Sequence, residues 1–257
     1  MDLLQSIILG IVQGISEFLP ISSDGHLVLM QRLLGFEGGS LVFNVTLHAG
    51  TLLSILCFYY RDLLKMFDWK FIWLGIASSV PTAIIGLLMK KYFDFENTSL
   101  HLVALFFAIS GLALFFAQKK NTKLGRDEVS LANVLAQIDL KMAFFIGVAQ
   151  GLAVLPGLSR SGSTIATALL LGCSGPVAAF YSFAISIPAV FGACLLELSD
   201  ATISSQDMPF YFIGAGISFV VGYFALHALS FIFTKRISLA YFSYYLWALA
   251  LLMVALG

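Results

Sequence analysis

Residues 13–26 read QGISEFLPISSDGH and gather two acids, two adjacent serines and a histidine around a single proline. Apolar sequence leads into this stretch from residue 3 and continues after it to residue 31. Proline ends or kinks helices, so the pattern predicts a helix that enters, breaks near Pro20 and resumes. Ionisable groups in apolar surroundings are costly, which indicates a functional site.

The composition of the whole chain places this break inside a membrane. Of its 257 residues, 60% are hydrophobic and 11% are charged, and the mean hydropathy is +0.95. These values are typical of integral membrane proteins and not of soluble domains. The 14 basic and 14 acidic residues balance, so nucleic acid is not expected as a partner. The predicted fold class is an all-α integral membrane protein.

A second polar break follows at residues 156–164, which read PGLSRSGST. Arg160 is the only charged residue within 142–196. Glycines, hydroxyls and a helix start around a guanidinium suit an oxyanion such as phosphate. The nucleotide-binding phosphate loop is excluded, because its lysine is absent and no strand precedes the stretch. Alternatively, Arg160 pairs with Glu17 or Asp24 as an internal staple.

The two broken regions align with each other at an offset of 137 residues. The identical pairs are Gly10 and Gly147, Gln13 and Gln150, Gly14 and Gly151, Ser22 and Ser159, Gly25 and Gly162, Leu33 and Leu170, Leu34 and Leu171, and Gly35 and Gly172. Biased composition is the alternative explanation. Each copy precedes three apolar spans, and an odd number of spans brings the chain to the opposite side of the membrane. The second copy therefore starts from that side, and we predict inverted repeats with two re-entrant helical hairpins. A single domain, 1–257, would contain repeat one (1–117), a cytoplasmic linker (118–138) and repeat two (139–257).

Six uncharged stretches are long enough to cross about 30 Å of hydrocarbon. They are residues 41–60, 71–89, 100–117, 173–196, 209–234 and 237–257. We therefore predict six transmembrane helices in addition to the two hairpins.

Basic residues predict the orientation of these spans. One side would carry Arg61, Lys65, Lys70, Lys119, Lys120, Lys123, Arg126, Lys141, Lys235 and Arg236, and the other Arg32, Lys90 and Lys91. The first side should be cytoplasmic. Both termini, the first hairpin's entrance and the 199–208 loop, with Asp200 and Asp207, would then face outward.

The sequences EFLPISSDGH at 17–26 and PGLSRSGST at 156–164 resemble the motifs of the undecaprenyl-diphosphatase family of bacitracin-resistance proteins. The resemblance covers nearly the whole chain, with the motifs in the same order. It implies hydrolysis of undecaprenyl pyrophosphate, a polyprenyl lipid, to the monophosphate and phosphate, with a divalent cation, Mg²⁺ or Ca²⁺. It also implies recycling of the lipid carrier for cell-wall peptidoglycan precursors at the outer face of the bacterial inner membrane, and bacitracin resistance.

This resemblance assigns roles to individual residues. The catalytic set would be Glu17, Ser23, His26 and Arg160, with Glu17 also binding the metal. The substrate-binding set would be Gln13, Ser22, Ser159, Ser161, Gly162 and Thr164. Arg160 and the amides of 159–164 would hold the pyrophosphate while Ser23 attacks the terminal phosphorus. His26, three residues further along, would accept the proton, although His26 as nucleophile or as activator of water remains an alternative.

Two positions depart from the family pattern. Gln13 stands where members often have glutamate, which puts in doubt a metal site with two carboxylates from this hairpin. Asp24 replaces a small hydroxyl residue and could supply the missing acid, although helix capping by Ser22, Ser23 or Asp24 is the simpler role.

A lipid-phosphate transporter is the rival function, because inverted repeats with broken helices also build secondary transporters. The enzyme is favoured because transport needs no nucleophile beside a base. His48, His101 and His227 are interpreted as isolated histidines that face neighbouring helices and not a metal. The three cysteines lack metal-site or disulfide spacing. The oligomeric state, including a homodimer, stays open.

Overall fold

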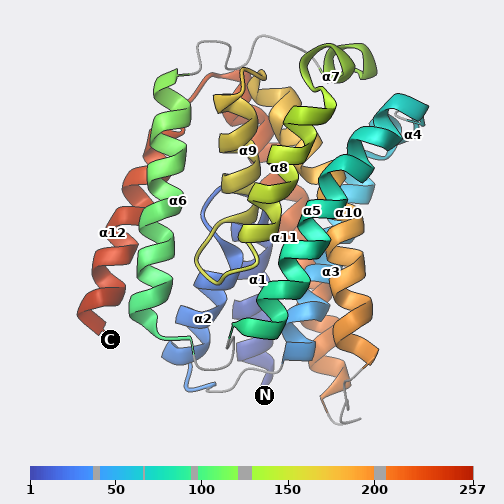
Figure 1. Ribbon diagram of the computed structural model, residues 1–257. Helices are drawn as coiled ribbons and strands as arrows, with labels where there is room; N and C mark the ends of the chain where they lie inside the picture. Colours follow the sequence, from blue (N-terminus) through green and yellow to red (C-terminus); the bar gives the residue numbers. More distant parts are fainter. Residues whose placement is uncertain (37–40, 66, 94–97, 121–128, 200–206, 257) are drawn as a thin grey trace.

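The computed structural model describes all residues except 37–40, 66, 94–97, 121–128, 200–206 and 257 (Figure 1). The described chain is helical, without a β-strand, as the sequence predicts. Its helices are α1 (Leu3–Phe18), α2 (Ser23–Leu33), α3 (Leu41–Phe58), α4 (Tyr60–Lys65), α5 (Trp69–Tyr92), α6 (Leu100–Lys120), α7 (Leu131–Gln137), α8 (Leu140–Leu152), α9 (Arg160–Leu170), α10 (Gly175–Ser199), α11 (Met208–Thr234) and α12 (Ala240–Leu256).

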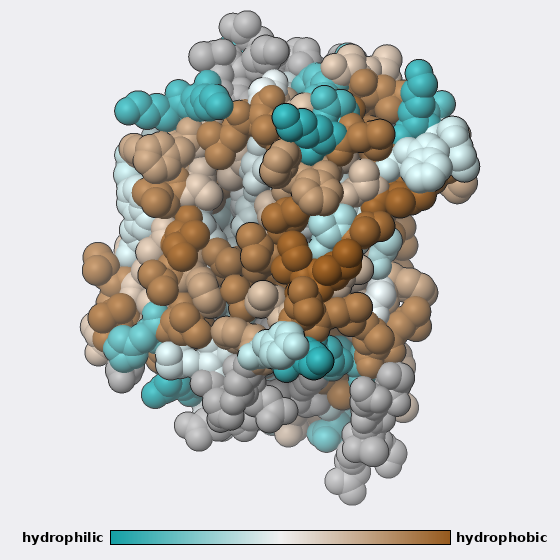
Figure 2. Space-filling view, in the orientation of Figure 1, coloured by the Kyte–Doolittle hydropathy of each residue, from teal (hydrophilic) through white to brown (hydrophobic). Residues whose placement is uncertain are grey.

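Four of these helices, α5, α6, α10 and α11, are long and apolar enough to cross a membrane, so the chain is a multi-pass membrane protein. Figure 2 shows hydrophobic side chains across the middle of the visible face and hydrophilic ones toward its two ends. The predicted spans 41–60 and 237–257 are shorter apolar helices, because α3 ends at Phe58 and α12 begins only at Ala240. A helix of about 17 residues rises roughly 25 Å, slightly less than the hydrocarbon thickness.

The chain makes two helical hairpins that run into the bundle from opposite ends (Figure 1). Helices α1 and α2 start from and return to the end where both termini lie, whereas α8 and α9 do so from the other end. The last turn of α6, with Lys119 and Lys120, lies at the end away from the termini. The last turn of α5, with Lys90 and Lys91, lies at the termini's end.

Some predicted features fall on residues outside the described parts. Lys123 and Arg126 belong to the stretch 121–128 of the predicted linker, and Asp200 belongs to 200–206. Within the rest of the predicted linker, residues 118–120 are the end of α6 and Leu131–Gln137 form α7, which meets α8 at a bend of 90°.

The hairpins break where backbone chemistry favours a turn. Helix α1 stops at Phe18, two residues before Pro20, and α2 follows Ser22, whose φ is 70°. Between α8 and α9, Gly157 has a φ of +102°, a conformation that glycine adopts without strain. Ser159 caps α9, its side chain accepting a hydrogen bond from the Gly162 amide. Ser22 makes no such side-chain cap, so the capping predicted for it is wrong.

The hairpins of the two halves have helix bounds that correspond at an offset of 137 residues, and each packs against a long helix of the other half. Moving α2 by 137 residues brings both of its ends onto those of α9, and the first residue of α1 falls on that of α8. A methyl group at Gly10 of α1 would meet Gly214 and Ile217 of α11. Correspondingly, a methyl group at Gly147 of α8 would meet Ser78 of α5. Each hairpin therefore packs through a glycine against a long helix of the other half.

Close approach at Gly50 predicts a stability effect. A methyl group there would overlap the carbonyl oxygen of Ala215 on α11 and lie 3.1 Å from its Cα. We expect Gly50→Ala to lower the unfolding temperature in detergent by the equivalent of about 1–3 kcal/mol. Gly216 is the matched control, because a methyl group there meets nothing within 4 Å. Gly216→Ala should leave the temperature unchanged or raise it, and equal losses in both variants would contradict the packing.

Candidate active site

The tips of the two hairpins touch each other at their breaks. A methyl group at Gly25 would lie 3.2 Å from the Gly157 Cα, and one at Gly162 would lie 3.5 Å from the Pro20 Cβ. Ser161 Oγ of the second hairpin donates to the Leu19 carbonyl of the first, at 3.2 Å. The second hairpin thus supplies a hydrogen-bond partner for the backbone at the first break.

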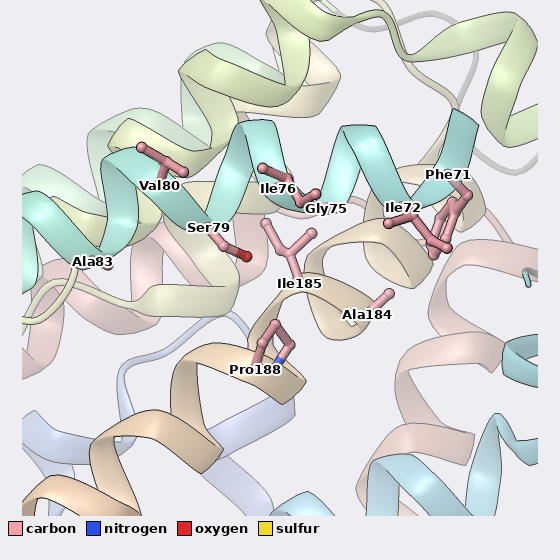
Figure 3. Close-up of a pocket in the computed structure, with 10 residues that line it drawn as sticks. All are labelled: Phe71, Ile72, Gly75, Ile76, Ser79, Val80, Ala83, Ala184, Ile185 and Pro188. Carbon is pink, nitrogen blue, oxygen red and sulfur yellow. The ribbon is translucent and has the colours of Figure 1, made fainter. Parts of the chain in front are cut away.

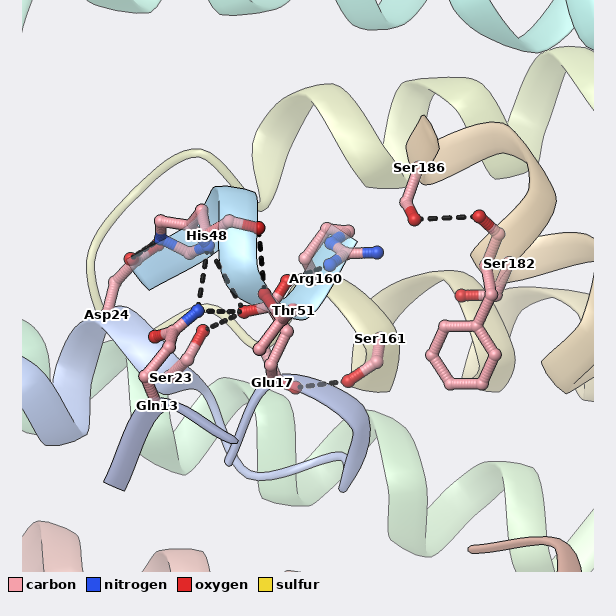
Figure 4. Close-up of polar contacts among 12 residues, drawn as sticks. Gln13, Glu17, Ser23, Asp24, His48, Thr51, Arg160, Ser161, Ser182 and Ser186 are labelled. Carbon is pink, nitrogen blue, oxygen red and sulfur yellow. Dashed lines mark hydrogen bonds and ion pairs between the residues drawn. The ribbon is translucent and has the colours of Figure 1, made fainter. Parts of the chain in front are cut away.

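Glu17 is the centre of the polar cluster at this crossing (Figure 4). Its side chain is 4% exposed. One carboxylate oxygen forms an ion pair with Arg160 Nη2 from the second hairpin. The other accepts hydrogen bonds from Ser23 Oγ at 2.6 Å and from Gln13 Nε2 at 3.0 Å. A buried carboxylate with this many donors is compensated, which explains how the acid is tolerated at this depth.

Arg160 has one terminal nitrogen in use and one without a partner. The ion pair with Glu17 is the internal staple that the sequence raised as an alternative. However, Nη1 is buried and has no hydrogen-bond partner among the described residues. Two acceptor-capable oxygens of the first hairpin, Gln13 Oε1 and Ser22 Oγ, are in the same condition. Buried polar atoms normally have partners, so these three atoms indicate where a polar ligand could bind.

Ser23 and His26 do not interact, although both belong to the first turn of α2. Ser23 donates to Glu17. His26 Nδ1 lies 2.7 Å from the Ser22 carbonyl oxygen, which can only accept, so Nδ1 carries a proton. Its Nε2 lies 2.7 Å from the Tyr245 hydroxyl on α12. The predicted serine–histidine pair is therefore wrong, because the two side chains leave the helix toward different neighbours.

The polar groups of the second hairpin mostly bind other protein groups. Ser159 N donates to Ser110 Oγ at 3.0 Å, Gly162 N donates to Ser159 Oγ at 3.0 Å, and Ser163 N donates to Ser159 O at 2.7 Å. Thr164 Oγ1 is 2.5 Å from Ser182 Oγ. The predicted cradle of free amides over 159–164 is thus not formed at positions 159, 162 and 163.

Comparison with known proteins identifies the family. The family model "Bacitracin resistance protein BacA" matches residues 6–252. The chain belongs to the BacA family. A protein from Carboxydothermus hydrogenoformans named undecaprenyl-diphosphatase is 38% identical, over 100% of this chain and 98% of its own length. Proteins with the same name from Halothermothrix orenii and Methanosphaera stadtmanae are 36% and 35% identical, over 100% of this chain and 99% of their own lengths.

His48 also contacts the polar cluster in this BacA family member, which the sequence does not predict. From α3, His48 Nδ1 lies 2.9 Å from Gln13 Nε2 and 3.4 Å from Glu17 Oε2, and Nε2 lies 3.1 Å from Asp24 Oδ1. The interpretation of His48 as an isolated histidine is wrong. No local pattern could reveal these contacts, because they depend on how α3 packs beside α1. His227, in contrast, packs against aromatic rings.

A pocket of about 500 Å³ lies between α5 and α10, away from the polar cluster (Figure 3). Its lining is apolar apart from Ser79, and none of the predicted site residues contributes to it. Over the described residues, no group of three or more histidine, cysteine and acidic side chains is arranged to hold a metal ion.

Proposed function

We propose that this chain is an undecaprenyl-diphosphatase, which hydrolyses undecaprenyl pyrophosphate to undecaprenyl phosphate and phosphate. One observation carries this proposal: a buried carboxylate, Glu17, accepts a hydrogen bond from the Ser23 hydroxyl and pairs with the Arg160 guanidinium. These groups supply a nucleophile, a proton acceptor and a phosphate ligand within one cluster. Full-length relatives that carry the name of this activity support it.

Arg160 is the group that would bind the pyrophosphate. Its Nη1 has no partner, and a guanidinium can donate two parallel hydrogen bonds to phosphate oxygens. Phosphoryl transfer depends mainly on positioning and on neutralising the charge of the equatorial oxygens. We place the terminal phosphate against Arg160 and within reach of Ser23, with Gln13 and Ser22 as further polar groups of the same cluster.

In the first chemical step, Ser23 Oγ attacks the terminal phosphorus and gives its proton to Glu17. The bond from this phosphorus to the bridging oxygen breaks, and undecaprenyl phosphate leaves. In the second step, water attacks the phosphorus of the phosphoserine and the bond from this phosphorus to Ser23 Oγ breaks. Ser23 Oγ takes back the proton held by Glu17, and phosphate is released. His26 would activate that water through Nε2, once the Tyr245 hydroxyl moves aside. Glu17 thus replaces His26 as the acceptor of the serine proton, in accord with the 2.6 Å contact.

A divalent cation, Mg²⁺ or Ca²⁺, is the proposed cofactor, and its chemistry would be to neutralise the pyrophosphate charge. The donor set suits such a hard cation, which prefers oxygen ligands. Glu17 Oε1 contacts Arg160 and retains a lone pair, whereas Oε2 already accepts two hydrogen bonds. The Gln13 amide nitrogen, and not its oxygen, faces this carboxylate. We therefore assign the cation to Glu17.

We further propose inverted repeats over 1–117 and 139–257, with α1–α2 and α8–α9 as re-entrant hairpins. The shared helix bounds at an offset of 137 and the exchanged packing at Gly10 and Gly147 support this topology. The basic last turn of α6, and Lys235 and Arg236 directly after α11, favour a cytoplasmic location for the end away from the termini. Both termini and the site opening would then face outward from the bacterial inner membrane. Labelling of an Asp2→Cys variant in intact cells can test this orientation.

The substrate fits this location, because its isoprenoid can stay in lipid while only the headgroup reaches the hairpin crossing. Release of the monophosphate would recycle the carrier for peptidoglycan precursors. It would also deplete the pyrophosphate form and so confer bacitracin resistance. Whether the chain acts as a monomer or a homodimer does not affect this chemistry, because every residue assigned above comes from one chain.

Phosphate release by the purified protein in detergent tests the function. We expect release from undecaprenyl pyrophosphate with Mg²⁺ or Ca²⁺, loss of release when a chelator removes the cation, and recovery when the cation is added back. Release that persists in the chelator would contradict the cation. A folded protein that releases no phosphate under any metal would contradict the enzyme and favour the lipid-phosphate transporter, which transport of labelled lipid phosphate in vesicles would measure.

A further inference from the structure

Four polar side chains from α1, α2 and α3 form a continuous chain of contacts that ends at Glu17. Asp24 Oδ1 lies 3.1 Å from His48 Nε2, His48 Nδ1 lies 2.9 Å from Gln13 Nε2, and Gln13 Nε2 lies 3.0 Å from Glu17 Oε2 (Figure 4). Gln13 is fully buried, and the His48 side chain is 20% exposed. Asp24, at 43%, is the most exposed member. The chain therefore leads from a partly exposed carboxylate to the buried one.

With a neutral His48 imidazole, hydrogen-bond chemistry allows one arrangement of protons along this chain. An ionised carboxylate only accepts, so the His48 nitrogen facing Asp24 donates. The other ring nitrogen can then accept from the Gln13 amide in the neutral imidazole. The second amide hydrogen is left for Glu17. Reversing the Gln13 carboxamide would place its oxygen against the Glu17 carboxylate, acceptor against acceptor, so His48 and Glu17 select the same orientation.

Among the described residues, His48 and Glu17 alone hold the Gln13 carboxamide in its orientation. Its Oε1 has no partner, so only the two contacts of its nitrogen hold the carboxamide. We propose that His48 is a positioning residue that fixes the Gln13 carboxamide and, through it, the Glu17 carboxylate that faces Ser23. Groups that orient a functional side chain from behind commonly change activity about 10- to 100-fold when removed. This inference rests on the proposed function, with His48 outside the set that touches substrate.

Kinetics of His48 variants provide the first test. We expect His48→Ala to lower kcat about tenfold and to change KM by less than about twofold, because the phosphate ligand Arg160 is untouched. His48→Gln offers a donor and an acceptor and should restore kcat to within about threefold of the wild type. His101→Ala, at an exposed histidine of α6, is the control. An unchanged kcat in His48→Ala, or no recovery with Gln, overturns the proposal.

Asp24 tests the same role without altering the buried residues. Asp24→Asn keeps an acceptor oxygen for His48 and should retain wild-type kcat, whereas Asp24→Ala removes the acceptor and should lower kcat about threefold. This pair remains informative if His48→Ala does not fold. Equal activity of the two Asp24 variants contradicts the proposal.

A double-mutant cycle with Gln13 tests whether His48 acts through this carboxamide. We expect Gln13→Ala with His48→Ala to be no slower than Gln13→Ala alone, whereas additive losses overturn the proposal. The same cycle measured by unfolding temperature should also be non-additive and needs no catalysis. A wild-type protein that releases no phosphate would therefore contradict the proposed function. The unfolding cycle would still test the role of His48, and additive losses of unfolding temperature would contradict that role.

Discussion

Arg160→Ala should lower phosphate release by at least about 10³-fold and also lower the unfolding temperature. The activity falls because the variant lacks the guanidinium that, among the described residues, lies at the hairpin crossing to bind the pyrophosphate. The stability falls because Glu17 loses its ion-pair partner while it stays 4% exposed. A buried charge left without its partner typically costs about 3–5 kcal/mol. Phosphate release and thermal unfolding of the purified protein measure the two effects.

Two companion variants separate binding from folding. Arg160→Lys keeps the positive charge beside Glu17 but lacks the planar fork, so it should fold nearly as well as the wild type and release phosphate about 10²-fold more slowly. Adding Glu17→Gln to Arg160→Ala removes the unpaired carboxylate, so the unfolding temperature should recover. A fully active lysine variant would show that phosphate is not held by the guanidinium, and an unrecovered double variant would place the stability loss elsewhere.

Ser23→Ala should lower phosphate release by about 10³-fold or more while the protein stays folded, because the nucleophile is lost and little volume changes. The matched control is Ser16→Ala, at a buried serine of α1 whose hydroxyl bonds the Val12 carbonyl of its own helix. That variant should release phosphate like the wild type. A Ser23→Ala variant within tenfold of wild-type activity would contradict the serine nucleophile.

Trapping the phosphoenzyme distinguishes Ser23 from His26. With substrate labelled in the terminal phosphate, His26→Ala should accumulate phosphoserine at Ser23, because the attacking water is not activated. Ser23→Ala should retain no covalent label. Label on His26 in the Ser23→Ala protein would instead make His26 the nucleophile and Ser23 an accessory group.

The two breaks could be predicted from the sequence because their causes are local. Pro20 and Gly157 are residues that interrupt helices, and the helices on either side of them begin and end near the predicted positions. The shortening of the span 41–60 could not be predicted, because α3 gives way to α4 at Tyr59 within residues 55–60, which contain no glycine or proline. Hydropathy indicates the surroundings of a segment, and it does not indicate the residue at which a helix ends.

The candidate site shows the same contrast between features with local causes and features that depend on tertiary packing. Glu17 and Arg160 were predicted because charges in apolar sequence are conspicuous, and their pairing was one of the alternatives. The partners of His26 and His48 were not predicted. His26 meets Tyr245, which is 219 residues away, and His48 meets Gln13, which is 35 residues away. Helical periodicity gives the face on which a side chain lies, but the neighbour on that face depends on tertiary packing.

The Glu17–Arg160 pair also has a consequence for biosynthesis. The two residues are 143 positions apart in the chain. At elongation rates of about 5–20 residues per second, Glu17 leaves the ribosome on the order of ten seconds before Arg160. During that interval the first hairpin carries a carboxylate without its counter-charge. We therefore expect the nascent first half to stay near the aqueous channel of the insertion machinery and to commit to the bilayer only when the second hairpin arrives.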